Sequence, residues 1–201
     1  MKGMVFREFC DMVERHHSPE LLDELIQGAE LPSGGAYTSV VTYDHREMLT
    51  LVGGLSRCTG LAAGDLVHGF GRHLLGVFRA KYPVFFEAAA DGYAFLDSID
   101  RTIHVEVRKL YPDAELPRFD CSRMTNEGMR LDYSSGRPFA HLAHGLIEAT
   151  MEHYGHTVDI TREDLAETWA ELNIAKTPDV DLVALGNPHF SLTEIEALAG
   201  L

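Results

Sequence analysis

The sequence predicts an α+β fold, with helices first and a small antiparallel sheet late in the chain. Two observations predict it. Apolar residues recur at helical spacing through most of the first 110 residues. Beyond Pro112, two short segments of alternating character flank a turn at Asn126-Glu127-Gly128, which is typical of a β-hairpin. With 201 residues, 45% of them hydrophobic, the chain is long enough for a domain with a substantial core.

The N-terminal part is predicted to be entirely helical. A helical hairpin occupies about the first thirty residues, and its second helix begins at Ser18-Pro19, an N-cap residue followed by a proline at the first helical position. Asp44, followed three residues later by Glu47, resembles a capping box that opens a third helix. A fourth helix is expected over residues 62–81, where the apolar residues form one broad stripe.

The second half mixes helices and strands. Residues 93–111 fit one long helix, despite a locally alternating pattern near its middle. Residues 116–123 and 129–135 are the candidate strands of the hairpin, and residues 138–154 return to a helix stopped by Gly155. A further strand is expected over residues 156–161.

Composition excludes several classes of function. The formal net charge of −14 repels phosphate backbones and anionic lipids, so we expect no nucleic-acid binding. No apolar run approaches the roughly 20 residues that span a bilayer, and the N-terminal residues lack a secretory pattern, so we expect a cytoplasmic protein. Cys10, Cys58 and Cys121 are far apart in sequence and are interpreted as small buried hydrophobic residues.

Three polar side chains stand at alternate positions after the second predicted strand. They are Tyr133, Ser135 and Arg137, and alternate residues of an extended backbone project from one face. A guanidinium beside two hydroxyl donors suits a carboxylate or phosphate group. Taken alone, the pattern is weak, because a half-exposed strand end would contain the same residues.

The spacing of these residues resembles the Tyr-x-Ser-x-Arg signature of the H-NOX family of haem-binding gas sensors, with His104 about thirty residues upstream. The resemblance extends in order over residues 1–161, with a distal part of about 1–60 and a proximal part of about 61–161. The matching segments are Met1-Lys2-Gly3, Gly71-Arg72, Ile103-His104-Val105-Glu106-Val107, Leu116-Pro117-Arg118 and Gly145-Leu146-Ile147-Glu148.

The resemblance implies a haem b cofactor with His104 as the axial iron ligand and Ile103 beside it in the pocket. It also implies that Tyr133, Ser135 and Arg137 bind the haem propionates and that Pro117 presses on the porphyrin. These roles are physically sensible, because a neutral imidazole suits iron and buried propionates need hydrogen-bond donors and a cation.

The same resemblance implies that the gas is nitric oxide. Oxygen-binding members place a hydroxyl donor in the distal pocket, whereas the corresponding residue here is Leu142. The other residues predicted to form the distal wall are also apolar: Val5, Phe9, Leu74, Phe78 and Leu146. We therefore expect nitric oxide to bind, with carbon monoxide as an adventitious ligand.

The output is expected to act in trans on a histidine kinase or a cyclic-di-GMP enzyme, because no kinase or cyclase motif is present, and we expect the chain not to be an enzyme. Two alternatives remain: an oxygen-binding or redox haem protein of the same fold, and a haem-free interaction module. A peroxidase would need a distal histidine and arginine, which the predicted wall lacks.

Two further features stand apart from the haem site. The remaining histidines are interpreted as solvent-facing or satisfied in the core; His141 and His144 could share a metal, but no third ligand is evident from the sequence. Residues 162–201 depart from the family pattern and resemble a fragment of the aconitase X and hydroxyproline dehydratase family. We infer no dehydratase activity, because that enzyme family needs a much larger chain.

Overall fold

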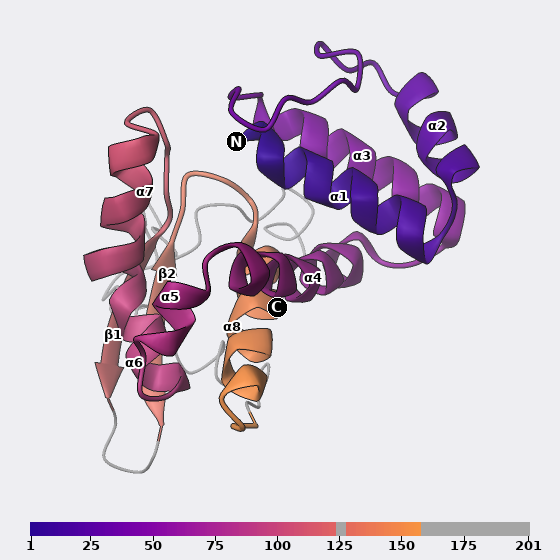
Figure 1. Cartoon of the computed structure of the whole chain (residues 1–201). Helices are drawn as coiled ribbons and strands as arrows, with labels where there is room; N and C mark the ends of the chain where they lie inside the picture. The colour runs from indigo at the N-terminus through magenta and orange to yellow at the C-terminus, as the bar shows by residue number, and fades with distance from the viewer. Residues whose placement is uncertain (124–127, 158–201) are drawn as a thin grey trace, which may run out of the picture.

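The fold is α+β, as predicted. The computed structural model describes residues 1–123 and 128–157, which form a largely helical structure with one two-stranded antiparallel sheet (Figure 1). In the order of the chain, the elements are α1 (Gly3–His16), α2 (Pro19–Gln27), α3 (His45–Thr59), α4 (Ala63–Lys81), α5 (Pro83–Glu87), α6 (Gly92–Ser98), the π-helical turn η1 (Ile99–Ile103), α7 (His104–Leu110), β1 (Arg118–Arg123), β2 (Met129–Ser134) and α8 (Ala140–His153). None of the described helices combines the length and the apolar character needed to cross a membrane.

The predicted helix boundaries in the N-terminal part have local causes. The Ser18 hydroxyl accepts a hydrogen bond from the Leu21 amide at 3.2 Å, and Pro19 takes the first position of α2. The Asp44 carboxylate caps α3 by accepting from the Arg46 amide at 2.9 Å. Gly60 ends α3 with a positive φ of 73°, a conformation that glycine adopts without steric cost.

Glu47 does not complete the predicted capping box. Its side chain is only 5% exposed and turns away from Asp44 toward the loop before α3. There it accepts hydrogen bonds from the Ser33 hydroxyl and, at 3.0 Å, from the Tyr37 hydroxyl. These two donors offset part of the cost of burying the carboxylate, and the contact fastens the loop to α3.

The interpretation of the cysteines was wrong for Cys58, which is exposed in the last turn of α3. Cys10 and Cys121 are partly buried, and burial raises the pKa of both thiols, that of Cys10 to about 11. Those two thiols are therefore protonated and weakly reactive at neutral pH.

The long helix predicted over residues 93–111 is helical, but it is not one continuous α-helix. Asp91 caps α6 by accepting from the Ala94 amide at 2.7 Å. One π-helical turn, η1, separates α6 from α7. Such turns are rare and frequently lie at functional sites. Here the turn directly precedes His104, the first residue of α7.

The predicted hairpin is confirmed, with β1 paired antiparallel to β2. Phe119 pairs with Tyr133, and Arg118 pairs with Ser134. Asn126 and Glu127 of the predicted turn lie outside the described residues, as do the predicted strand from residue 158 onward and the segment 162–201.

The apolar residues form two core clusters. The larger cluster joins α1, α2, α3 and α4, whereas the smaller one is centred on Leu75, Phe86 and Phe95. Phe78 of α4 and Leu146 of α8 pack against both clusters. In Figure 1, α1, α2 and α3 lie on one side of α4 and α8, and α7 with the hairpin lies on the other. Helices α4 and α8 thus form the seam between the two halves.

Two glycines bring α4 and α8 into backbone contact. A Cβ atom on Gly71 would clash with the carbonyl oxygen of Leu142, and one on Gly145 would clash with the carbonyl oxygen of His68. Because backbone atoms cannot move aside cheaply, only glycine allows the two helices to approach this closely.

We therefore expect Gly145→Ala to lower the free energy of unfolding by about 1–3 kcal/mol, as overpacking of a tight interior contact does. Gly76→Ala is the matched control, because no atom lies within 4 Å of a Cβ at Gly76 of α4. The control should stabilise α4 by up to about 1 kcal/mol through its higher helix propensity. Urea denaturation followed by circular dichroism measures both, and equal effects of the two variants would contradict the close contact.

Candidate functional site

His104 is a buried histidine held in one orientation. It begins α7 and is 9% exposed. Its Nδ1 atom lies 2.6 Å from Oδ1 of Asp100, one helical turn earlier. Burial lowers the pKa of His104 more than the hydrogen bond to Asp100 raises it, so the neutral imidazole is favoured. With Nδ1 engaged as the donor, Nε2 is the nitrogen that can bind a metal.

Asp100 connects His104 to the sheet. While Oδ1 contacts His104, Oδ2 accepts a hydrogen bond from the backbone amide of Phe119 in β1 at 2.9 Å. Sequence analysis did not identify Asp100, although the spacing of four residues between an aspartate and a histidine on one helix was an available signal. The carboxylate therefore joins η1, α7 and β1 at a single point.

The Phe119 ring lies next to both His104 and Tyr133, the first residue of the predicted Tyr-x-Ser-x-Arg segment. Its ring centroid is 5.9 Å from that of His104 and 5.3 Å from that of Tyr133, its cross-strand partner. Burial raises the pKa of the Tyr133 phenol, so the hydroxyl stays protonated and can donate. The hairpin thus brings Tyr133 next to the same aromatic ring that His104 contacts, although the two residues are distant in sequence.

The three polar residues keep the alternation expected of an extended segment. Tyr133, Ser135 and Arg137 are half-buried, whereas Ser134 and Gly136 between them are exposed. The Ser135 hydroxyl accepts from the Arg137 amide at 3.1 Å, which tightens the turn after β2. The structure therefore places the three side chains on the less exposed face of this segment.

Arg137 is already part of an ion pair. Its guanidinium is 18% exposed and donates from Nη2 to Oε2 of Glu115 at 2.5 Å, and the Glu115 side chain is 80% exposed. Glu115 was not predicted, and no sequence pattern pointed to it. An arginine has five N–H donors, so Arg137 can hold a second carboxylate beside Glu115.

Pro117 and Ile103 flank the same region. Pro117 immediately precedes β1 and is half-buried. Ile103 ends η1 and packs against the cluster of Leu75, Phe86 and Phe95. Ile103 directly precedes His104 in the chain, and Pro117 stands two residues before Phe119.

The six residues predicted to form an apolar wall come from three helices and gather in one cluster. Phe9 is fully buried and Leu74 is 2% exposed. The partly buried members pack against the same cluster: Val5, Phe78, Leu142 and Leu146. The tertiary structure therefore brings together residues from α1, α4 and α8 that are up to 141 positions apart.

The arrangement suits a haem. An oriented neutral imidazole offers an axial ligand, apolar side chains suit the porphyrin faces, and a half-buried arginine with two hydroxyls suits the propionate carboxylates. These requirements come from the residues themselves and do not depend on family membership.

Comparison with known proteins places this fold in a class of haem-based gas sensors. The family model "Haem-NO-binding" matches residues 2–162, and the chain belongs to this H-NOX family. Proteins of this family bind haem and gaseous ligands and signal to partners.

Solved H-NOX structures agree with the fold. The H-NOX protein from K. algicida in the unliganded Fe(II) state is 40% identical, with a TM-score of 0.76 over 80% of this chain and 87% of that chain. The one from S. oneidensis in the Fe(II)NO state is 26% identical, with a TM-score of 0.74 over 80% and 89%. The IWP-051-bound protein from Shewanella woodyi in the Fe(II)CO state is 42% identical, with a TM-score of 0.68 over 77% and 82%.

A much shorter similarity concerns an enzyme. Cis-3-hydroxy-L-proline dehydratase from Pseudomonas aeruginosa is 51% identical over 45 residues, which are 22% of this chain and 8% of the enzyme. The chain thus spans less than a tenth of that curated relative.

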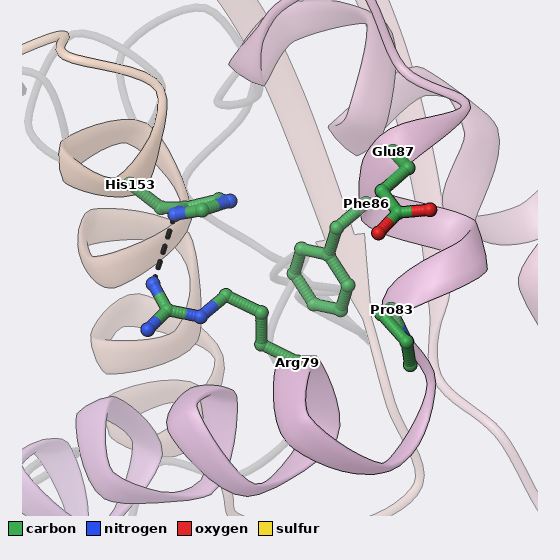
Figure 2. A pocket seen from close by; sticks show the side chains of 5 residues that line it. All are labelled: Arg79, Pro83, Phe86, Glu87 and His153. Carbon is green, nitrogen blue, oxygen red and sulfur yellow. Dashed lines mark hydrogen bonds between the residues drawn. The ribbon is translucent and has the colours of Figure 1, made fainter.

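A surface pocket shares Phe86 with the smaller core cluster. It is lined by Arg79, Pro83, Phe86, Glu87 and His153, from α4, α5 and α8 (Figure 2). Arg79 Nη1 lies 2.9 Å from His153 Nδ1 at its edge. None of the predicted haem-site residues lines this pocket, so we do not assign it to the cofactor.

We expect Asp100→Ala to speed haem loss, because a carboxylate on the second imidazole nitrogen orients a ligating histidine and strengthens it as a ligand. Losing such a partner typically lowers metal affinity about 10- to 100-fold. Transfer of haem to a scavenging protein gives the rate, and the iron–histidine stretching frequency in resonance Raman spectra should fall. Asp97→Ala, which removes an exposed aspartate paired only with Arg101 among the described residues, is the control and should change neither quantity.

Proposed function

We propose that the protein is a nitric oxide sensor that holds haem b through His104 and passes its signal to a separate enzyme. One observation carries the proposal: a buried histidine oriented by Asp100 contacts the ring of Phe119, which also contacts Tyr133, the first residue of the Tyr-x-Ser-x-Arg segment. Membership of the H-NOX family supports the same assignment.

His104 would bind the iron through Nε2, while Tyr133, Ser135 and Arg137 would bind the propionates. Arg137 would then hold a propionate together with Glu115, or release Glu115 to solvent. Pro117, next to β1, would press on the porphyrin. The haem supplies the iron centre to which the gas binds.

The apolar wall supports nitric oxide as the gas. Phe9, Leu74 and Leu142 carry hydrocarbon side chains, which cannot donate a hydrogen bond to the polar bound oxygen molecule. Nitric oxide binds ferrous haem strongly without such a donor. The S. oneidensis relative has been solved with nitric oxide bound and the S. woodyi relative with carbon monoxide, which supports the same ligands here.

The signal would start at His104. His104 would hold the iron, and gas binding at the haem would loosen that hold, so that His104 could move together with α7, the helix it begins. Asp100 would transmit this change to β1 through the Phe119 amide. The receiver would be a histidine kinase or a cyclic-di-GMP enzyme in the cytoplasm, and the chain itself would act as a sensor without catalysing a reaction.

Replacement of His104 by glycine tests the axial ligand. His104→Gly should fold but lose most of its haem, and added imidazole should restore the Soret band, because the propionate-binding residues remain. His17→Gly, at an exposed position beyond α1, should keep its haem without imidazole. An unchanged ferrous spectrum of His104→Gly without imidazole would mean that another residue binds the iron.

Selectivity is tested by exposure of the reduced protein to air. The unmodified protein should not bind oxygen stably, while nitric oxide should shift its Soret band. Leu142→Tyr adds a hydroxyl, and one net hydrogen bond of about 1 kcal/mol would slow oxygen dissociation about fivefold. Leu142→Phe has the same ring without the hydroxyl and should not show the gain. A long-lived oxygen complex of the unmodified protein would overturn the nitric oxide assignment.

A further inference from the structure

Three metal-ligating side chains meet on the surface where α4 and α8 cross. His68 comes from α4, and His144 and Glu148 come from α8. His68 Nε2 lies 2.8 Å from Glu148 Oε2, and His144 Nε2 lies 3.1 Å from Glu148 Oε1. The three potential ligand atoms all lie within 4.8 Å of one another.

The glycine contact between the helices determines this meeting. Gly145 faces the backbone carbonyl of His68. His144, the residue before Gly145, is therefore brought close to His68. His144 and Glu148 are four residues apart and therefore share one face of α8. The rings of His68 and His144 lie with their centroids 4.7 Å apart at 63°. The backbone thus fixes all three side chains on rigid helices.

His144 is the least satisfied member of the group. Its Nε2 atom is buried and lies 3.1 Å from Glu148 Oε1, but without hydrogen-bond geometry to Glu148 or to any other described residue. The interpretation that the remaining histidines are solvent-facing or satisfied is therefore wrong for His144. It is also wrong for His73, whose Nε2 atom is buried without a hydrogen bond to any described residue. Leaving a buried polar atom without a partner is unfavourable, so a ligand at this point would be stabilised.

We propose that His68, His144 and Glu148 form a second metal site, separate from the haem, for a divalent transition-metal ion such as Zn²⁺. Two imidazoles and one carboxylate, with a fourth position for water, are a common zinc ligand set. Small rotations of the side chains would bring the three ligand atoms to the roughly 2 Å bond lengths that zinc requires.

A neighbouring cation restricts the choice of metal. Arg72 Nη1 lies 3.2 Å from Glu148 Oε2, while its other nitrogen pairs with Glu152 at 2.6 Å. The positive charge weakens the carboxylate as a ligand, so most of the affinity must come from the imidazoles. Mg²⁺ and Ca²⁺, which prefer oxygen ligands, should therefore bind poorly, whereas Zn²⁺ and Cu²⁺ suit the site.

The sequence offered His141 and His144 as two residues that could share a metal. In the structure, His144 lies instead with His68 and Glu148. His141 lies against Gly64 at the start of α4, where its ring is the nearest group to a Cβ built on that glycine. It is absent from the group of mutually close ligands among the described residues. His141 therefore provides a control on the same helix.

The experiment measures zinc bound to the haem-loaded, tag-free full-length protein. Equilibrium dialysis against Zn²⁺, followed by elemental analysis, should give one zinc in addition to the haem iron. His68→Gln and His144→Gln should each weaken zinc binding at least about tenfold, since even the loss of a supporting residue has effects of this size. His141→Gln should bind zinc like the unmodified protein, and so should Cys58→Ser, which removes an exposed thiol.

Two readouts protect the test from misfolding of a variant. The Soret band and the far-ultraviolet spectrum of each variant must match those of the unmodified protein. Crystals grown with Zn²⁺ should show an anomalous peak between His68 and His144. The proposal would be overturned if the unmodified protein failed to bind zinc, if His68→Gln and His144→Gln bound zinc as tightly as the unmodified protein, or if the zinc peak lay elsewhere. The cluster would then be an ion-pair network.

Discussion

The backbone contact between α4 and α8 determines how the two halves of the structure meet. Gly71 and Gly145 allow the two helices to touch without intervening side chains. One consequence is that Leu74 of α4 and Leu142 of α8 reach the same apolar cluster. Another is that His68 of α4 meets His144 and Glu148 of α8. A single close contact therefore shapes both the apolar wall and the proposed zinc site.

Asp100 has a comparable role next to the hairpin. It is the carboxylate that joins His104 to the β1 backbone, with one oxygen for each. The π-helical turn η1 ends one residue before His104 and includes Asp100, so the turn and the carboxylate together set the direction of the imidazole. A movement of His104 would thus be transmitted through Asp100 directly to β1.

The two proposed metal sites use histidine in different ways. His104 is held by one carboxylate on Nδ1 and is nearly enclosed, which suits one strong axial bond. His68 and His144 share one carboxylate near the surface, which suits a site that exchanges its ion with solvent. Because both helices of the second site also carry residues of the apolar wall, an ion there would hold two of the wall's three helices, α4 and α8, in register.

The α+β class, most helix boundaries, the hairpin and the family were all predicted from the sequence. These depend on local signals: helical periodicity, the Ser18 and Asp44 caps, and the spacing of Tyr133, Ser135 and Arg137. Glu47, in contrast, binds Ser33 and Tyr37 instead of closing a capping box. This depends on tertiary contacts with the loop before α3.

Other features were likewise set by tertiary contacts. The Asp100 bridge, the Arg137–Glu115 pair and the meeting of His68 with His144 and Glu148 each join separate elements. Partners of this kind are 19 to 80 residues apart in the chain, as in the bonds from Phe119 to Asp100 and from His68 to Glu148. Periodicity and capping act over a few residues, so such contacts leave no local pattern and are determined by how the helices and the hairpin pack.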